Sequence, residues 1–351
     1  MAALDANGHP LSQISARKLE HLRLSLEASV QSTRSAGFER FAFVHNALPE
    51  QDLDQVDLST TFLGRPLRQP FLISSMTGGA KSAGDINRRL ALVAQTLGLA
   101  FGVGSQRAGL THKDLRATYQ VRQVAPDVLL FANLGAVQLN YGMRPEQCLE
   151  AVEMIGADAL VLHLNPLQEA LQPEGDHNFR GLLEKIAGVC AALPVPVIVK
   201  EVGSGISAEV ARRLTSAGVA AIDIAGMGGT SFARVEAFRR ERAEDVELAL
   251  AFSEWGIPTA RALRSVREAV PDLPIVASGG IRNGLDAAKA LAMGASLVGF
   301  AHSVLVAAQD GEQPVRALLD GFAWQLRVAM FCAGAHDLQT LRTVAVLEET
   351  A

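Results

Sequence analysis

The sequence has few cysteines and few large aromatic residues. It contains three cysteines, two tryptophans and two tyrosines among 351 residues. The cysteines, Cys148, Cys190 and Cys332, are odd in number and far apart, which fits neither a disulfide framework nor a zinc site. We therefore expect a protein of a reducing compartment, the cytoplasm.

A long apolar run and an excess of basic residues are also missing. No stretch of about 18 apolar residues could span a bilayer, and the start, MAALDANGHPLSQ, lacks the cationic and then apolar profile of a signal peptide. The 32 Lys and Arg residues are outnumbered by 37 Asp and Glu residues, giving a net charge of −5 and a pI of about 5.9. Neither nucleic acid nor a membrane is therefore expected as a partner.

Apolar residues and glycine are abundant. Hydrophobic residues make up 49% and charged residues 20% of the chain, and the mean hydropathy is +0.19. This composition is typical of a well-packed globular protein. The 31 glycines indicate many tight turns and close backbone approaches, as in folds that bind cofactors through main-chain groups.

Eight short apolar runs, each followed by a segment with helical periodicity, predict the fold class. Strands that are apolar on both faces form a parallel sheet covered by helices, and closing such a sheet gives the (β/α)8 TIM barrel, an α/β fold. A doubly wound open sheet is the alternative. The runs lie at residues 70–75, 99–104, 128–135, 159–165, 196–203, 220–226, 274–280 and 296–303.

The chain is expected to form a single domain with two additions to the barrel of residues 70–345. Residues 1–69 are an N-terminal extension with a helical, charged start and then a loop-like stretch, which should pack on the mouth or floor of the barrel. The connection at about 231–262 is unusually long, and AFRRERAEDVELALAF within it carries mixed charge at helical spacing. This pattern predicts a helix with a solvent-exposed face, and a mobile lid is the alternative.

In such a barrel the active site lies at the carboxyl ends of the strands. After the first run, SSMTGGA at 74–80 has paired glycines that let a flat ligand approach the backbone, and a threonine hydroxyl; a tight turn is the alternative. After the second run, Ser105, Gln106 and Arg107 offer a hydroxyl, an amide and a permanent cation. This set suits anionic oxygens, although Arg107 could equally be a lone surface residue.

The segment HLNPLQE at 163–169 is the most informative. His163 and Asn165 are two residues apart on a strand and should share a face, while the proline turns the chain and brings Gln168 and Glu169 beside them. A glutamate among neutral donors could hold Mg²⁺, a hard cation that often bridges to substrate phosphates. The alternative is a glutamate that interacts with a helix dipole.

Three further strand ends carry polar residues. Lys200 ends the fifth run, and an ammonium buried there needs a negative partner. Asp223 is either that partner or a structural acid. Asn133 either points into the mouth or serves a turn, and the glycine-rich segment 226–231, with Thr230, is either an anion-binding turn or an ordinary loop.

A phosphate site is expected at the last two strands. SGGIRNG at 278–284 opens a helix, and GFAHS at 299–303 follows, where barrels of this type commonly bind phosphate. Near the N-terminus, Arg17, Lys18 and His21 lie on neighbouring positions of a helix and could bind a second anionic group. A solvated helix face is the alternative.

With these segments, the sequence resembles the type 2 isopentenyl-diphosphate isomerases, which are FMN-dependent (β/α)8 enzymes. The resemblance spans nearly the whole chain, and HLNPLQE and MTGG are its specific motifs, whereas SGGIR is shared by many flavin and phosphate barrels. The supporting segments are RKLEH (17–21), SSMTGGA (74–80), GSQR (104–107), ANLG (132–135), HLNPLQE (163–169), KEVGSGIS (200–207), AGMGGTS (225–231), WGIPT (255–259) and SGGIRNG (278–284).

The resemblance implies a residue set for each ligand. For FMN it implies Ser75, Met76, Thr77, Ser105, Asn133, Lys200, Thr230, Gly279, Gly280, Ile281, Arg282, Ala301 and His302, of which the last six residues would take the phosphate. For the isoprenoid diphosphate it implies Arg17, Lys18, Ser105, Gln106, Arg107, His163, Asn165 and Gln168, with Glu169 binding the associated Mg²⁺.

The implied reaction interconverts isopentenyl and dimethylallyl diphosphate by adding a proton at one carbon and removing one from another. No net electrons are exchanged, and reduced FMN is the implied proton shuttle through N5. Lys200 would stabilise the anionic reduced flavin, and NADPH or another reductant would produce it. His163 and Gln168 would orient the substrate and relay protons. Members of the family form homo-oligomers, so a tetramer or octamer is expected.

Two rival functions remain open on the sequence alone. One is another FMN barrel. It could be a 2-hydroxy acid oxidase or dehydrogenase, which needs an arginine and histidine pair on late strands and could use Arg282 and His302. It could also be an inosinate dehydrogenase-like enzyme, which needs a loop cysteine that this sequence lacks. The other is a non-catalytic phosphate-binding barrel.

Overall fold

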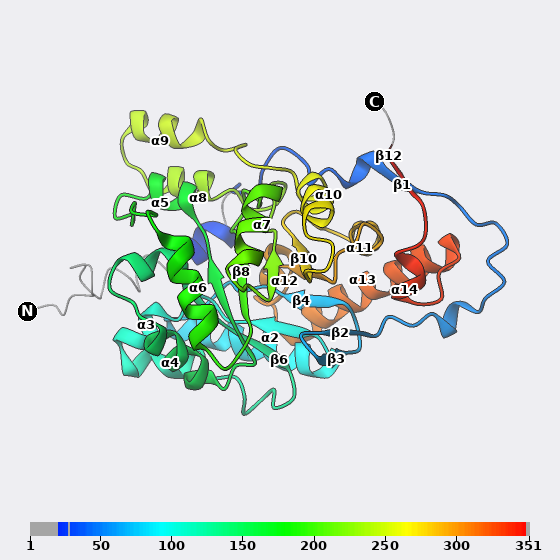
Figure 1. Cartoon of the computed structure of the whole chain (residues 1–351), viewed down its shortest axis with the longest axis horizontal. Coiled ribbons are helices and arrows are strands. Elements are labelled where there is room, and N and C mark those ends of the chain that lie inside the picture. Colours follow the sequence, from blue (N-terminus) through cyan, green and yellow to red (C-terminus); the bar gives the residue numbers. More distant parts are fainter. Residues whose placement is uncertain (1–19, 27–28, 349–351) are drawn as a thin grey trace, which may run out of the picture.

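The computed structural model describes residues 20–26 and 29–348, and it shows a closed parallel barrel. The strands follow one another round the barrel in the order β10-β11-β4-β5-β6-β7-β8-β9, which confirms the (β/α)8 fold and rules out the open sheet. Figure 1 shows the barrel strands among the helices. Each predicted run contains one strand, shorter than the run. The strands are β4 (Phe71–Ile73), β5 (Ala100–Gly102), β6 (Leu129–Gly135), β7 (Ala159–His163), β8 (Val197–Lys200), β9 (Ala221–Asp223), β10 (Ile275–Ser278) and β11 (Leu297–Phe300).

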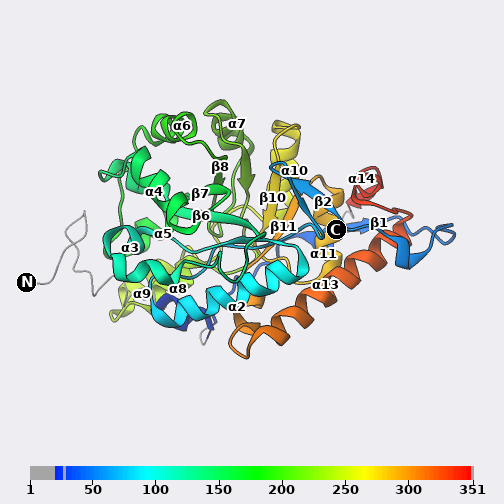
Figure 2. The same ribbon diagram turned by 90° about the horizontal axis from the view of Figure 1, so that it is seen from below.

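Helices surround the barrel and cover its outer face, with α2 and α13 packed side by side (Figure 2). Most of their buried residues are apolar and recur at helical spacing, as at Ala262, Leu263 and Val266 of α10. Burial of these faces against the strands forms the largest apolar cluster of the described residues. The main covering helices are α2 (Lys81–Leu97), α4 (Pro145–Ile155), α6 (Leu182–Ala192), α7 (Ala208–Ser216), α10 (Thr259–Ala269), α11 (Gly284–Ala292) and α13 (Glu312–Ala333).

A β-hairpin closes the floor of the barrel, where a loop was expected. Strands β2 (Thr60–Phe62) and β3 (Arg65–Leu67) pair in antiparallel fashion. The two residues between them, Leu63 and Gly64, both have positive φ, 48° and 76°, as the favoured two-residue hairpin turns require. Phe62 and Leu67 join the apolar cluster inside the barrel, so the loop-like expectation for residues 60–67 was wrong.

The rest of the N-terminal extension runs from the mouth to the C-terminal end of the chain. A helix covers residues 20–26. Residues 30–32 then lie beside the loop after β9, because Ser32 N–H donates to the Gly229 carbonyl and Ser231 N–H donates to the Val30 carbonyl, both at 2.8 Å. Further along, β1 (Phe41–Phe43) pairs with β12 (Val346–Glu348).

The long connection after β9 forms two helices before α10. These are α8 (Phe232–Phe238) and α9 (Ala243–Leu250). Most of α9 is exposed, as the charge pattern predicted, and Ala249 is the buried residue that packs it against α8 and α5 (Pro166–Leu171). Three further short α-helices are α3 (Arg107–Thr111), α12 (His302–Ala307) and α14 (Leu338–Leu341).

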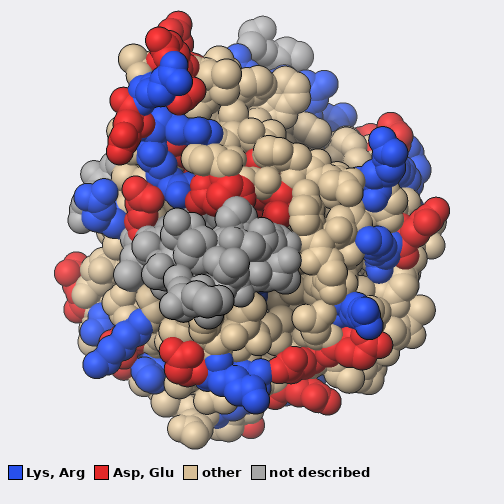
Figure 3. All heavy atoms as spheres, turned by 90° about the vertical axis from the view of Figure 1, so that its left-hand side faces the viewer, with Lys and Arg blue, Asp and Glu red and all other residues tan. Residues whose placement is uncertain are grey.

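The surface of the molecule carries both signs of charge. Basic and acidic side chains are interspersed on the face seen in Figure 3, as the small net charge of −5 suggests. Within residues 20–26 and 29–348, no helix is both long and apolar enough to cross a membrane.

Candidate active site

A cavity of about 560 Å³ opens at the carboxyl ends of the barrel strands. Segments that follow all eight strands line it, and the helix of residues 20–26 adds His21, Leu22 and Ser25. Its volume is in the range of small-molecule and cofactor sites. The location is the one expected for an active site in this fold.

Most of the residues expected to bind ligands line this cavity. The exceptions are Arg17 and Lys18, which lie outside the described residues, and Gln106. The expected residues that line the cavity are Ser75, Met76, Thr77, Ser105, Arg107, Asn133, His163, Asn165, Gln168, Glu169, Lys200, Thr230, Gly279, Gly280, Ile281, Arg282, Ala301 and His302.

Gln106 has a structural role and is not placed to contact a substrate. Its side chain is fully buried, and its Oε1 accepts the backbone N–H of Asn133 at 2.9 Å while its Nε2 donates to the Ala151 carbonyl at 2.8 Å. The amide therefore joins the segment after β5 to β6 and α4. Its neighbours Ser105 and Arg107 line the cavity, and Gln106 points away from it.

Lys200 and Asp223 form a buried ion pair at neighbouring strand ends. Lys200 Nζ lies 3.3 Å from Asp223 Oδ2, and the side chains are 11% and 3% exposed. The other carboxylate oxygen accepts a hydrogen bond from Ser278 Oγ at 2.6 Å. Of the two roles considered for Asp223, the structure therefore supports the partner of Lys200.

The imidazole of His163 is oriented by the amide of Asn133. Nδ1 of His163 lies 2.9 Å from Oδ1 of Asn133. An amide oxygen only accepts hydrogen bonds, so Nδ1 carries a proton and donates it. The ring lies next to Gly135, where an added Cβ would come within 3.1 Å of Nε2. The tautomer and plane of His163 are thus set by its neighbours.

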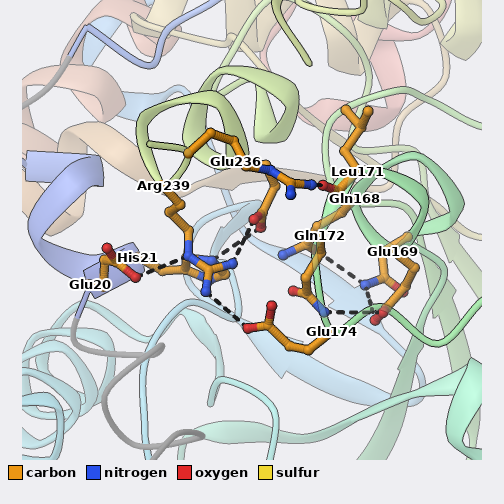
Figure 4. A network of polar contacts seen from close by, with 11 residues as sticks. Glu20, His21, Gln168, Glu169, Leu171, Gln172, Glu174, Glu236 and Arg239 are labelled. Atoms are coloured by element: carbon orange, nitrogen blue, oxygen red, sulfur yellow. Dashed lines mark hydrogen bonds and ion pairs between the residues drawn. The ribbon is translucent and has the colours of Figure 1, made fainter. Parts of the chain in front are cut away.

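Glu169 lies in a cluster of amide donors at the start of α5. Asn165 Nδ2 donates to Glu169 Oε1 at 2.9 Å and to Gln168 Oε1 at 3.1 Å. Gln172 Nε2 donates to Glu169 Oε2 at 3.3 Å (Figure 4). The backbone N–H of Asp176 donates to the same oxygen at 2.7 Å. These three donors around one buried carboxylate fix its orientation toward the cavity that it lines.

The oxygens of this cluster suit a hard cation. Besides the Glu169 carboxylate, Asn165 Oδ1 is buried and has no hydrogen-bond partner among the residues that the structure describes. Carboxylate and amide oxygens are ligands that Mg²⁺ accepts, usually with substrate phosphates completing the shell. Across the described part of the chain, no group of three or more His, Cys, Asp or Glu side chains could hold a metal alone. A ligand with phosphate oxygens would have to complete this site.

Glycines shape the cavity at β10 and β9. Gly279 and Gly280 have φ of 98° and 74°, and an added Cβ on Gly279 would lie 2.1 Å from the Gly226 carbonyl oxygen. Side chains are therefore excluded, and backbone groups line the cavity here. The first turns of α11 and α12 follow directly, and N–H groups at helix starts favour anions. This cradle suits the phosphate of a flat cofactor such as FMN.

Arg282 and His302 are both bound to backbone carbonyls. Arg282 Nη2 donates to the Gly228 carbonyl at 3.3 Å, and His302 Nε2 donates to the Ser25 carbonyl at 2.9 Å. Burial, together with the charge of Arg282, lowers the pKa of His302 despite the hydrogen bond to Ser25. A neutral His302 thus fastens the helix of residues 20–26 to the start of α12.

A second set of buried charges at the mouth was missed by the sequence analysis. Arg239, at the end of α8, donates to Glu236 at 2.6 Å, to Glu174 at 2.9 Å and to Glu20 at 3.0 Å (Figure 4). His21 Nε2 lies 3.1 Å from Glu236 Oε1. Burial raises the pKa of Glu236, but His21 and Arg239 outweigh it and hold the pKa below its ordinary value. The i, i+3 spacing of Glu236 and Arg239 was the one signal in the sequence for this network.

Comparison with known proteins gives both a sequence and a fold relationship. The family model described as FMN-dependent dehydrogenase matches residues 157–348. An isopentenyl-diphosphate delta-isomerase of Synechococcus sp. is 54% identical over 337 residues, covering 96% of this chain and 97% of that protein. The protein of the same name from Stutzerimonas stutzeri is 53% identical, covering 95% and 97%.

The structural neighbours are more distant. A mandelate oxidase structure with (S)-2-phenylpropionate matches with a TM-score of 0.66, covering 97% of this chain and 99% of that one. Its sequence is 20% identical, so the likeness concerns the fold alone.

Proposed function

Because the chain belongs to the FMN-dependent, type 2 isopentenyl-diphosphate delta-isomerases, we propose that this cavity interconverts isopentenyl and dimethylallyl diphosphate with reduced FMN and Mg²⁺. One observation supports this use of the cavity most strongly: the glycine cradle and the Glu169 cluster lie at opposite ends of it. The glycine cradle follows β10 and β11, whereas the Glu169 cluster follows β7, which lies across the barrel from β11. One end suits a cofactor phosphate and the other a metal-bound diphosphate.

The residues proposed to hold FMN fall into two groups. The glycine cradle, Ala301 and His302 would take the phosphate, and the residues after β4, β5 and β6, with Thr230, would line the ring. When bound in its reduced form, FMN would supply a group that gives and takes a proton at N5. Main-chain donors and excluded side chains in the cradle are the features that favour this assignment.

Lys200 is proposed to act as a fixed cation beside the cofactor. Its ammonium stays in place because it pairs with Asp223, whose other carboxylate oxygen is held by Ser278. A preorganised charge in a cavity with little water stabilises negative charge on a neighbouring group without reorganisation. This is the electrostatic role that an anionic reduced flavin needs.

The substrate is proposed to bind at the Glu169 end. Glu169 would ligate Mg²⁺, and Arg107 and Gln168, together with Arg17, Lys18, Ser105 and Asn165, would contact the diphosphate. His163 would orient the hydrocarbon end of the substrate, with its Nδ1 proton directed to Asn133. His163 and Gln168 would also relay protons to and from the substrate carbons, which exchanges no net electrons.

Three further features are proposed on the family relationship. NADPH or another reductant would reduce the flavin, the enzyme would work in the cytoplasm, and it would assemble as a homo-oligomer, a tetramer or an octamer. Size-exclusion chromatography with light scattering measures the last of these.

The test is turnover of isopentenyl diphosphate by FMN-loaded protein under three conditions. We expect product with dithionite and Mg²⁺, and none when the flavin is oxidised or EDTA is added. Glu169→Gln should lower turnover about 100-fold, because it removes the charged metal ligand, and should leave FMN bound. Glu184→Gln, an exposed glutamate on α6, is the matched control. Oxidation of a 2-hydroxy acid without isomerisation would favour the rival oxidase function instead.

A further inference from the structure

The loop of residues 172–177, which follows α5, wraps around Glu169. Gln172 Nε2 and the backbone N–H of Asp176 both donate to Glu169 Oε2, at 3.3 and 2.7 Å. The packing is so close that a Cβ added to Gly175 would lie 1.8 Å from the Glu169 carbonyl oxygen. The orientation of Glu169 therefore depends on the shape of this loop.

The side chain of Asp176 points to a second residue of the same site. Its Oδ2 accepts hydrogen bonds from Arg107 Nη1 at 3.2 Å and from Gln138 Nε2 at 2.7 Å. The side chains of Arg107 and Asp176 are 15% and 7% exposed. Asp176 thus contacts Arg107 through its carboxylate and Glu169 through its backbone, and it is not among the residues that line the cavity.

The loop is also held from its outer side. Glu174 accepts from Arg239 Nη2 at 2.9 Å, and Arg239 belongs to the buried charge network of α8 (Figure 4). The loop is therefore tied to α8 on one side and to Glu169 and Arg107 on the other. Such a doubly anchored loop can transmit a fixed geometry to the residues that it touches.

We propose that Asp176 is a positioning residue that fixes Arg107 and Glu169 relative to each other for the metal-bound diphosphate, an inference that rests on the proposed function. A carboxylate that binds a guanidinium from one side fixes the plane of all its N–H donors. The same residue sets the direction of the metal-ligand carboxylate through its backbone N–H. One loop residue thereby aligns a cation and a metal ligand from two different strand ends.

A purely electrostatic role of Asp176 makes the opposite prediction. A negative charge beside a diphosphate site repels the ligand, so its removal would tighten binding. Positioning predicts weaker binding, because Arg107 loses its fixed orientation. The sign of the change in affinity therefore distinguishes the two roles.

The experiment titrates FMN-loaded protein with inorganic pyrophosphate in the presence of Mg²⁺ by calorimetry. Asp176→Asn should raise the Kd about tenfold, and the KM for isopentenyl diphosphate should rise similarly while kcat changes less than about twofold. The matched control is Asp158→Asn. Asp158 accepts from Arg122 at 2.6 Å in another partly buried ion pair, directly before β7 at the floor end. This control should leave the Kd unchanged.

Two further variants make the test decisive. If Asp176 acts through Arg107, the double variant Arg107→Ala/Asp176→Asn should bind pyrophosphate no worse than Arg107→Ala alone. If Asp176→Asn does not fold, Asp176→Glu, which retains the charge but displaces it, should still raise the Kd. A Kd that is unchanged or lowered in the folded variant, or additive effects in the double variant, would overturn the inference. Failure of the unmodified protein to bind pyrophosphate would instead count against the proposed function.

Discussion

Lys200 and Asp223 carry opposite charges in a part of the cavity that is nearly closed to solvent. Their atoms are 3.3 Å apart, and neither side chain is more than 11% exposed. Burying two charges costs about as much free energy as their attraction returns, so the pair contributes little to folding. Its proposed value lies in the cavity, where Asp223 keeps the Lys200 cation at a fixed place.

Replacing Lys200 by Ala should weaken retention of FMN about tenfold or more, because Asp223 is then left as an uncompensated charge beside the ligand. The flavin released on dialysis, followed by absorbance, measures this. Lys289→Ala is the control, since Lys289 lies on α11, donates to the Phe38 carbonyl and is outside the cavity lining. If both variants retained FMN equally well, Lys200 would have no role in binding FMN.

Single site residues could be predicted where the strand itself directs the side chain. Lys200 is the last residue of β8 and His163 is the last residue of β7, and both line the cavity. Gln106 was wrongly expected to contact the substrate. Its amide instead satisfies buried backbone groups, and the residue type alone cannot reveal this. Asp176 was missed because its loop folds back onto α5, a contact that no periodicity encodes.

At the scale of elements, α8 joins segments that are far apart in the sequence. Arg239 binds carboxylates from the helix of residues 20–26, from the loop after α5 and from its own helix, and it is 9% exposed. Glu236 in this network is fully buried. The eight strands could be predicted from their apolar runs, whereas this junction could not, because it depends on charges brought together by folding.

Replacing Arg239 by Gln should lower the free energy of unfolding by about 2–4 kcal/mol, because buried Glu236 loses its guanidinium partner. Urea unfolding measures the change, and limited trypsin digestion should cut the helix of residues 20–26 sooner. Arg242→Gln, which breaks the exposed pair with Glu244, should have little effect on either. Similar behaviour of the two variants would show that the network does not hold the helix.

Glu254 fastens the N-terminal extension to the segment after α9. Its carboxylate accepts from Ser32 Oγ at 2.6 Å and from the backbone N–H groups of Thr33 and Arg34 at 3.1 Å. Burial raises the pKa of Glu254, but these hydrogen bonds outweigh it and lower the pKa from 4.5 to about 2. The pKa is therefore lower in the folded than in the unfolded chain, so the contribution to stability is full above pH 4.5 and is lost as the pH falls toward 2.

Glu254→Gln should accordingly lower the free energy of unfolding by about 1–2 kcal/mol at pH 7. Below pH 4.5 the unmodified protein should lose stability more steeply than the variant, down to the lowest pH at which both remain folded. Urea unfolding across this range measures both effects. Parallel pH profiles would show that the depressed pKa of Glu254 does not contribute.

At the scale of the whole molecule, the closed barrel places the glycine cradle and the Glu169 cluster at opposite ends of one cavity. β11 and β7 are separated by three strands in either direction round the ring, so the cradle and the Glu169 cluster face each other. The hairpin of β2 and β3 closes the floor, and the N-terminal extension passes beside the mouth. This arrangement accommodates the proposed cofactor and substrate with their phosphates at opposite sides.

The most direct measurement is nuclear magnetic resonance of isopentenyl diphosphate incubated in D₂O with the FMN-loaded, reduced protein and Mg²⁺. The account predicts dimethylallyl diphosphate that carries deuterium from the solvent, with the flavin still reduced at equilibrium. An unchanged substrate beside protein that retains its reduced flavin would contradict it.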